Sequence, residues 1–114
     1  MQLIESIVAD ATSIAAVRRD LHAHPELCFE EVRTSDLIAS KLTDWGIEVH
    51  RGLGTTGVVG IVRNGTSNRA VGLRADIDAL PMTEHNRFDH ASRHAGRMHA
   101  CGHDGHTAML LAAA

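Results

Sequence analysis

The segment from Met98 to Thr107 concentrates side chains that bind metal ions. It holds one thiol, one carboxylate and three imidazoles, which come from Cys101, Asp104, His99, His103 and His106. Cys101 and His103 stand two positions apart, and in an extended backbone such residues project to the same side, within reach of one cation. A loop that happens to be rich in histidine is the alternative interpretation. The number of donors together favours a metal site with Cys101 and His103 as ligands.

Two aspartates, Asp76 and Asp78, stand at the end of the apolar run 71–75. Carboxylates at the point where a buried strand ends lie where open α/β sheets bind their ligands. Turn capping is the alternative, because aspartate is common in turns and Pro81 shows that a turn is near. Two close carboxylates repel each other unless a cation or a positively charged neighbour lies beside them. We therefore expect both aspartates near the metal site.

The rest of the sequence predicts the helices that position these residues. Apolar residues recur at intervals of three and four from Leu3 to Leu21, which predicts an amphipathic helix that ends before Pro25. A second helix is expected over about 34–45, with Gly46 as a left-handed stop. A third helix is expected to begin at Thr107.

Three short segments have the pattern of β-strands. Residues 47–50 alternate between apolar and polar side chains, and the segments 58–62 and 70–75 are apolar. Asn64 and Gly65 predict the turn between the last two. The three strands are expected to share one sheet, which with the helices predicts an α/β fold.

Composition excludes some partners. The 114 residues are 44% hydrophobic and 22% charged, which suits one soluble domain or part of one. A net charge of −3 argues against nucleic acid and anionic membrane surfaces, so a small-molecule partner is expected. The first ten residues carry acids and lack a long apolar core, so they read as neither a signal peptide nor a membrane span. The cytoplasm is the expected location.

The chain has two cysteines, Cys28 and Cys101. They could pair, but a lone disulfide is rare in the cytoplasm, and Cys101 has a better use as a ligand. Cys28 lies between Leu27 and Phe29 and is predicted to be a thiol of the buried core.

The last segment, 107–114, is an apolar helix that stops without glycine, asparagine or a basic last turn. Two helices and three strands leave little to cover it. A metal site also needs at least three protein ligands, and the loop offers two good ones. We therefore expect the chain to be truncated, with other ligands supplied from elsewhere.

Three longer motifs occur in order along the chain. They read RRDLHAHPELCFEE at 18–31, GLRADIDALP at 72–81 and HACGHDGH at 99–106. In this order they resemble the amino-terminal signatures of the hippurate hydrolase group. These are metal-dependent N-acyl amino acid amidohydrolases, which include plant indole-acetyl amino acid hydrolases. The resemblance covers nearly the whole chain.

The resemblance implies that residues 1–114 form the amino-terminal part of a catalytic domain. That part would be a partial three-layer αβα fold of the zinc-peptidase type with a mixed sheet, and the lid domain would be absent. A complete site would hold two divalent metal ions. The resemblance implies that Cys101 and His103 are metal ligands. It implies that Asp76 and Asp78 lie near the metals and support the ligands. It also implies that the general base is a glutamate beyond Ala114. His22, His24 and Glu26 are interpreted as structural.

These parts imply hydrolysis of the amide bond of N-acyl amino acids in the complete protein, whereas the 114 residues alone are expected to be inactive. A thiolate ligand favours zinc, nickel, cobalt or manganese over magnesium or calcium. The sequence leaves a homo-oligomer open.

Two alternative functions stand beside this hypothesis. Cys101 could be the nucleophile of a cysteine hydrolase, activated by His103 or His99, although the aspartates would then have no purpose. The chain could also be a non-catalytic metal-binding or assembly fragment. Metal dependence separates the first alternative from the hypothesis, and activity relative to a full-length protein separates the second.

Overall fold

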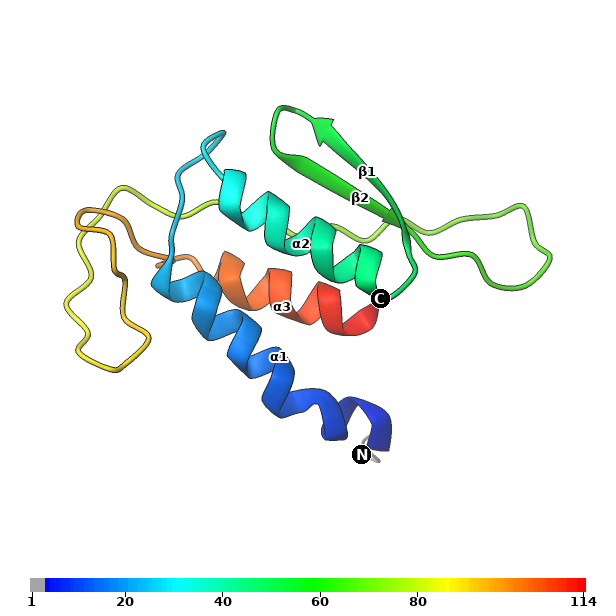
Figure 1. Cartoon of the computed structure of the whole chain (residues 1–114), viewed down its shortest axis with the longest axis horizontal. Coiled ribbons are helices and arrows are strands. Elements are labelled where there is room, and N and C mark those ends of the chain that lie inside the picture. The colour runs from blue at the N-terminus through cyan, green and yellow to red at the C-terminus, as the bar shows by residue number, and fades with distance from the viewer. Residues whose placement is uncertain (1–3) are drawn as a thin grey trace.

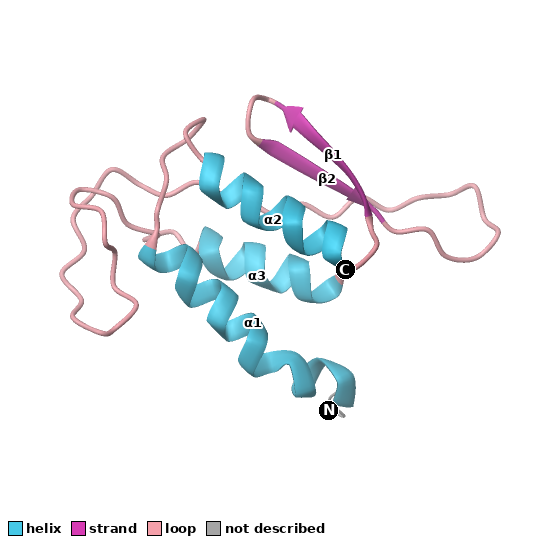
Figure 2. Cartoon of the chain, viewed as in Figure 1, coloured by secondary structure: helices cyan, strands magenta, loops and turns pink. Residues whose placement is uncertain are grey.

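The computed structural model describes residues 4–114, which form three helices and a two-stranded antiparallel sheet (Figure 1, Figure 2). The elements in chain order are α1 (Glu5–Ala23), α2 (Val32–Asp44), β1 (Glu48–Leu53), β2 (Gly57–Ile61) and α3 (His103–Ala113). Between β2 and α3 runs a long connection, 62–102, without helix or strand. The mixed α/β composition agrees with the prediction from sequence.

The helices form where the sequence patterns place them. α1 ends two residues before Pro25, as expected, and Leu3, the predicted start of its pattern, lies outside the described residues. α2 is followed by Gly46 at a φ of +75°, which confirms this glycine as the left-handed stop. α3 begins at His103, four residues earlier than predicted, so the metal-binding segment includes the start of a helix.

A small apolar core joins the helices to the β-hairpin. Ile38 and Leu42 of α2 meet Leu111 of α3 at its centre. Around these pack half-buried side chains from every other part of the fold, namely Val17, Ile47, Val49, Val58 and Ile77. A Cβ atom at Gly60 would lie 3.1 Å from Leu42, so the hairpin approaches α2 closely. α3 lies beside α1 and between it and α2 in Figure 1.

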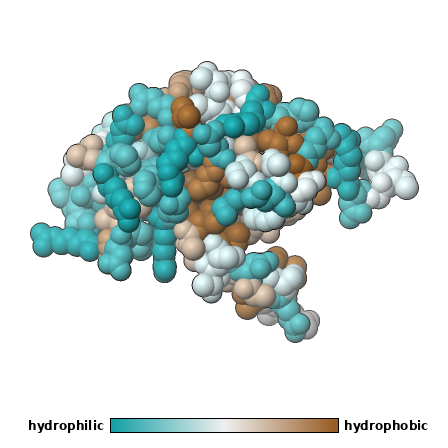
Figure 3. Space-filling model, viewed as in Figure 1, coloured by the Kyte–Doolittle hydropathy of each residue, from teal (hydrophilic) through white to brown (hydrophobic). Residues whose placement is uncertain are grey.

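The predicted third strand, 70–75, does not form. Its residues have no regular structure and no strand partner within residues 4–114, and Val71 and Leu73 are 88% and 70% exposed. The prediction was wrong because an apolar run becomes a strand only when a neighbouring strand accepts its backbone hydrogen bonds. Hydrophobic surface is visible elsewhere too, in the middle of the face shown in Figure 3 and on the protruding first turns of α1.

Short backbone contacts bring the three sequence motifs together. Leu27 pairs with Ala79 in a parallel bridge, and Leu80 pairs with Met98 in an antiparallel one. The loop after α1, the Asp-rich segment and the segment before α3 are therefore side by side. In this arrangement Cys28 is exposed, and its predicted place in the core was wrong, because the turn that carries it lies on the surface.

None of the helices described over residues 4–114 combines the length and the apolar character that crossing a membrane requires.

Candidate metal centre

His103, the first residue of α3, is oriented by Asp78. Its Nδ1 atom lies 2.9 Å from Asp78 Oδ1 and 2.9 Å from the Asp78 backbone oxygen. A ring nitrogen between two acceptors carries the proton, which leaves Nε2 with its lone pair. Metal-binding histidines are commonly held in this way, with one nitrogen on a carboxylate and the other facing the ion.

Cys101 stands on the other side of Gly102 and is exposed. Gly102 has a φ of +102° and a ψ of 13°, and it caps the start of α3. The extended backbone expected between Cys101 and His103 is therefore wrong, because a left-handed glycine and a helix start replace it. Cys101 immediately precedes the N-cap of α3, and the dipole at a helix N-terminus favours a negative charge.

Asp76 lies farther from the histidine than Asp78. Its Oδ2 atom is 3.9 Å from His103 Nε2, beyond hydrogen-bonding distance, and its carboxylate pairs with Arg74. The Asp76 backbone oxygen accepts a hydrogen bond from Thr107 Oγ1 at 3.2 Å, which joins the Asp-rich segment to α3. The structure thus brings both aspartates to His103 but gives them different contacts.

The donor set suits a borderline metal ion but is incomplete. A thiolate and a neutral imidazole are the ligands that zinc and its neighbours prefer. In the described part of the chain, no three side chains of the histidine, cysteine, aspartate and glutamate types are placed to hold an ion. The residues present therefore fit part of a metal site, and the source of further ligands stays a prediction.

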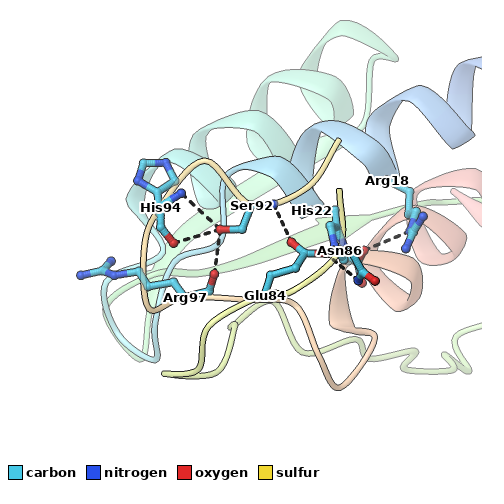
Figure 4. Close-up of polar contacts among 8 residues, drawn as sticks. Arg18, His22, Glu84, Asn86, Ser92, His94 and Arg97 are labelled. Carbon is cyan, nitrogen blue, oxygen red and sulfur yellow. Dashed lines mark hydrogen bonds and ion pairs between the residues drawn. The ribbon is translucent and has the colours of Figure 1, made fainter. Parts of the chain in front are cut away.

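Behind this site lies a buried ionic network that the sequence did not reveal (Figure 4). His22 of α1 bridges two carboxylates, with Nδ1 2.8 Å from Asp104 Oδ2 and Nε2 3.0 Å from Glu84 Oε1. The side chains of His22, Asp104 and Glu84 are 5%, 2% and 3% exposed. Arg18 Nε adds a contact to Asp104 at 3.0 Å. The network fastens α1, α3 and the connecting loop to one another.

Glu84 is held in its charged form. Burial is the largest influence on this carboxyl and raises its pKa, but the hydrogen bonds from His22, the Ser92 backbone N–H and Asn86 together outweigh burial and lower the pKa to about 2. The Ser92 N–H donates to Oε2 at 2.5 Å, and Asn86 Nδ2 donates to Oε1 at 2.9 Å. Glu84 therefore remains a carboxylate throughout the physiological range.

His99 differs from His22 in having no hydrogen bond. It is 4% exposed, and over residues 4–114 neither ring nitrogen has a partner. Burial, with contributions from the charges of His22 and His103, lowers the pKa of His99 against the opposing effect of Asp104 and Asp78. The lowered pKa favours the neutral form of this ring, whose centroid lies 6.4 Å from that of His22.

Sequence reasoning missed the network because its partners are distant in the chain. His22 is separated from Glu84 by 62 positions and from Asp104 by 82. Interpreting His22 as structural was consistent with its burial, but Glu84 was assigned no role and Asp104 was counted only among the possible metal donors. The available signal was a histidine next to Leu21 on the buried face of a helix, since a buried polar side chain requires a partner.

Comparison with known proteins identifies relatives of the whole chain. Residues 72–114 match peptidase family M20/M25/M40. The chain is 46% identical over 114 residues to hippurate hydrolase of Campylobacter jejuni, covering 100% of this chain and 30% of that protein. It is 47% identical over 104 residues to the N-acyl-L-amino acid amidohydrolase of Geobacillus stearothermophilus, covering 90% of this chain and 28% of that protein.

A solved structure shows the same fold. The YXEP protein of Bacillus subtilis, described as a dinuclear metal binding peptidase from the M20 family, superposes with a TM-score of 0.86 at 42% identity. The superposition covers 91% of this chain and 29% of that one. The chain thus spans less than a third of the length of these relatives.

Proposed function

We propose that this chain, whose sequence and fold are those of the amino-terminal portion of the peptidase family M20/M25/M40, forms part of the catalytic domain of a metal-dependent amidohydrolase. The relatives' names support amide hydrolysis as the reaction and N-acyl amino acids, such as hippurate, as the small-molecule substrates. Residues 1–114 would supply part of the catalytic domain. The lid domain, the general-base glutamate and the remaining ligands would come from polypeptide outside them.

Within this proposal, Cys101 and His103 bind the metal. The observation that carries it is the 2.9 Å contact from Asp78 to His103 Nδ1, which directs the lone pair of Nε2 away from the aspartate. Asp78 therefore orients the ligand. Asp76, which is paired with Arg74, contributes negative charge near the same nitrogen.

When bound, two divalent ions of zinc, nickel, cobalt or manganese would polarise the scissile carbonyl and lower the pKa of a bound water. The contribution of this chain is to hold Cys101 and His103 in place and to maintain the hydrogen bond between His103 and Asp78. The family's dinuclear relative supports two ions, and the identity of the metal stays a prediction.

The structure also bears on the cysteine-nucleophile alternative. Cys101 does lie next to a helix start, as an activated thiol would. However, within residues 4–114 no imidazole is hydrogen-bonded to its sulfur, which a cysteine–histidine pair requires. Metal dependence therefore remains the property that separates the two mechanisms.

The test is to measure metal content and hydrolysis in the full-length protein that carries this sequence. Cys101→Ala or His103→Ala should remove bound metal and lower hydrolysis of hippurate and N-acetyl amino acids by about 10²-fold or more, since losing a ligand should cost at least as much as losing a residue behind it. Cys28→Ala and His50→Ala, which change the same residue types elsewhere, should retain the metal. Unchanged metal content in the first two variants would contradict the assignment.

The 114 residues alone provide the complementary test. They should bind a divalent ion weakly and should not hydrolyse these substrates, because two donors leave most of the coordination shell to water. Chelator-sensitive turnover comparable to that of the full-length protein would show that the isolated chain holds a complete site.

A further inference from the structure

Cys28 and Phe29 form the tip of a turn that follows α1, and the fold leaves both exposed. The Glu30 N–H donates to the Leu27 carbonyl at 2.8 Å, which closes the turn. Phe29 has a φ of +66° and is 67% exposed. Only Phe29 and Thr55 among the non-glycine residues described here have a positive φ, and Thr55 lies in the turn between β1 and β2.

This conformation is costly for phenylalanine. The third position of a turn with a positive φ favours glycine or asparagine, and a bulky side chain there is strained. Burial of the ring does not compensate for the strain, because most of the ring is in solvent. Strained residues of this kind concentrate at sites where another molecule is bound.

The turn is held firmly in place beside the candidate metal centre. The Ala79 N–H donates to the Glu26 carbonyl at 2.7 Å, and Leu27 forms the parallel bridge with Ala79, the neighbour of Asp78. On the other flank, the buried Glu31 accepts a hydrogen bond from Thr56 Oγ1 at 2.7 Å. The exposed tip is therefore supported on both sides by buried contacts.

Cys28 lies near Asp78. It directly follows Leu27, which pairs with Ala79, the residue next to Asp78. An independent sign of this proximity is that the pKa of the Cys28 thiol is raised by partial desolvation and then by the charges of Asp78 and Glu31. Asp78 is the residue that orients His103, so the turn borders the metal centre.

We propose that Cys28 and Phe29 contact the acyl group of the substrate and determine which acyl groups are accepted. This inference rests on the proposed function. A thiol and an aromatic ring offer an uncharged, polarisable surface that suits an aromatic or alkyl group. Glu30 is paired with Arg97, and Glu31 is buried and bonded to Thr56. The carboxylate of Asp78 near the turn disfavours the carboxylate of the amino acid, so the uncharged acyl end of the substrate lies on this side.

The first experiment compares N-benzoyl and N-acetyl derivatives of one amino acid in the full-length protein. Phe29→Gly removes the ring at a position where glycine is favoured, so folding should be preserved. It should lower the ratio of kcat/KM for benzoyl over acetyl substrate by roughly threefold to tenfold, the effect of one aromatic contact. Phe29→Leu should restore part of the ratio. Trp45→Ala, which removes another exposed aromatic ring at the far end of α2, should leave the ratio unchanged.

The second experiment measures binding without relying on hydrolysis. The protein is alkylated with iodoacetamide while hippurate or N-acetylglycine is kept in large excess. Peptide mass spectrometry then measures the alkylation of Cys28 separately from that of Cys101. Hippurate should slow alkylation of Cys28 more than N-acetylglycine does. Phe29→Gly should reduce that difference.

The outcomes separate this inference from the proposed function. If hydrolysis is observed but the benzoyl preference and the alkylation of Cys28 do not respond, the acyl contact is overturned and the proposed function stands. If neither substrate is hydrolysed but hippurate still protects Cys28 selectively, the proposed function fails and the acyl contact stands. If neither hydrolysis nor protection occurs, both are overturned.

Discussion

Two neighbouring residues, His103 and Asp104, belong to regions with opposite properties. His103 faces the partly exposed Asp78 and keeps one ring nitrogen free, whereas Asp104 is 2% exposed and binds both His22 and Arg18. Successive residues of a helix point about 100° apart, so one step along α3 moves from one region to the other. Among the described residues, His103 Nε2 at the candidate metal centre has no hydrogen bond, whereas both ring nitrogens of His22 in the network do.

Under the proposed function, this contrast separates the residues that would bind metal from the residues that support them. Buried charges are stable only when each is paired, so the network around His22 resists change. A metal centre must retain unpaired donors until its ions arrive, which requires a rigid base to hold them. The network supplies that base because it fixes the first turn of α3 against α1.

The largest expected effect lies in the buried network. His22→Leu should lower the free energy of unfolding of the full-length protein by about 3–5 kcal/mol, because it leaves the Asp104 and Glu84 carboxylates buried without their shared partner. The measurement is denaturant unfolding. His50→Leu, which removes an exposed histidine paired with Glu48, should change stability by less than about 1 kcal/mol. Equal effects of the two substitutions would contradict the contrast between the regions.

A smaller effect, seen in catalysis and not in folding, is expected at Asp78. Asp78→Asn should lower turnover by about 10- to 100-fold while substantial metal stays bound, since it weakens the support of His103 and leaves both ligands present. Metal content and kcat are measured on the same preparations. Asp36→Asn, which alters an exposed partner of Arg51, is the matched control. Normal turnover in Asp78→Asn would show that Asp78 has only a structural role in the turn.

Acid should destabilise the network through Glu84. The pKa of this carboxyl is about 2 in the folded chain against an ordinary value of 4.5, so below pH 4.5 the unfolded state binds more protons. The stability that Glu84 contributes is complete above about pH 4.5 and is lost as the pH falls toward 2. Glu84→Gln should therefore show a shallower loss of stability over this range.

The control for the acid experiment is Glu48→Gln. The pKa of Glu48 is also lowered, by hydrogen bonds from His50 and Arg63, but this carboxyl lies on the surface, where solvent screens its interactions. Its substitution should alter the pH dependence less. If Glu48→Gln changed the pH dependence of stability more than Glu84→Gln does, burial would not be the reason that the two carboxylates differ.

The smallest effect on stability is expected in the unpaired segment 70–75. Val71→Ser with Leu73→Ser should change the stability of the isolated chain by no more than about 0.5 kcal/mol, because both side chains are already exposed. It should also reduce self-association, measured by analytical ultracentrifugation, since it removes apolar surface. Strong destabilisation would show that these residues pack against the rest of the chain.

Local patterns were enough to predict the helices and to single out Cys101 and His103, whose role as metal ligands stays a prediction. The spacing of apolar residues, Pro25 and Gly46 predict where α1 and α2 end, because these signals act within a few residues. The same is true of the ligand-rich segment, whose Cys101 and His103 lie close together in any fold. The motifs around them were sufficient to indicate the family.

Only the tertiary structure decided which of these residues face one another. The apolar run 70–75 has the composition of a strand but lacks a partner in the described chain, and pairing depends on distant backbone. His22 meets Asp104 and Glu84 across 82 and 62 positions, and Cys28 reaches the vicinity of Asp78 through a bridge between Leu27 and Ala79. No local signal encodes such distances, because they result from how α1, α3 and the loops pack around a shared core.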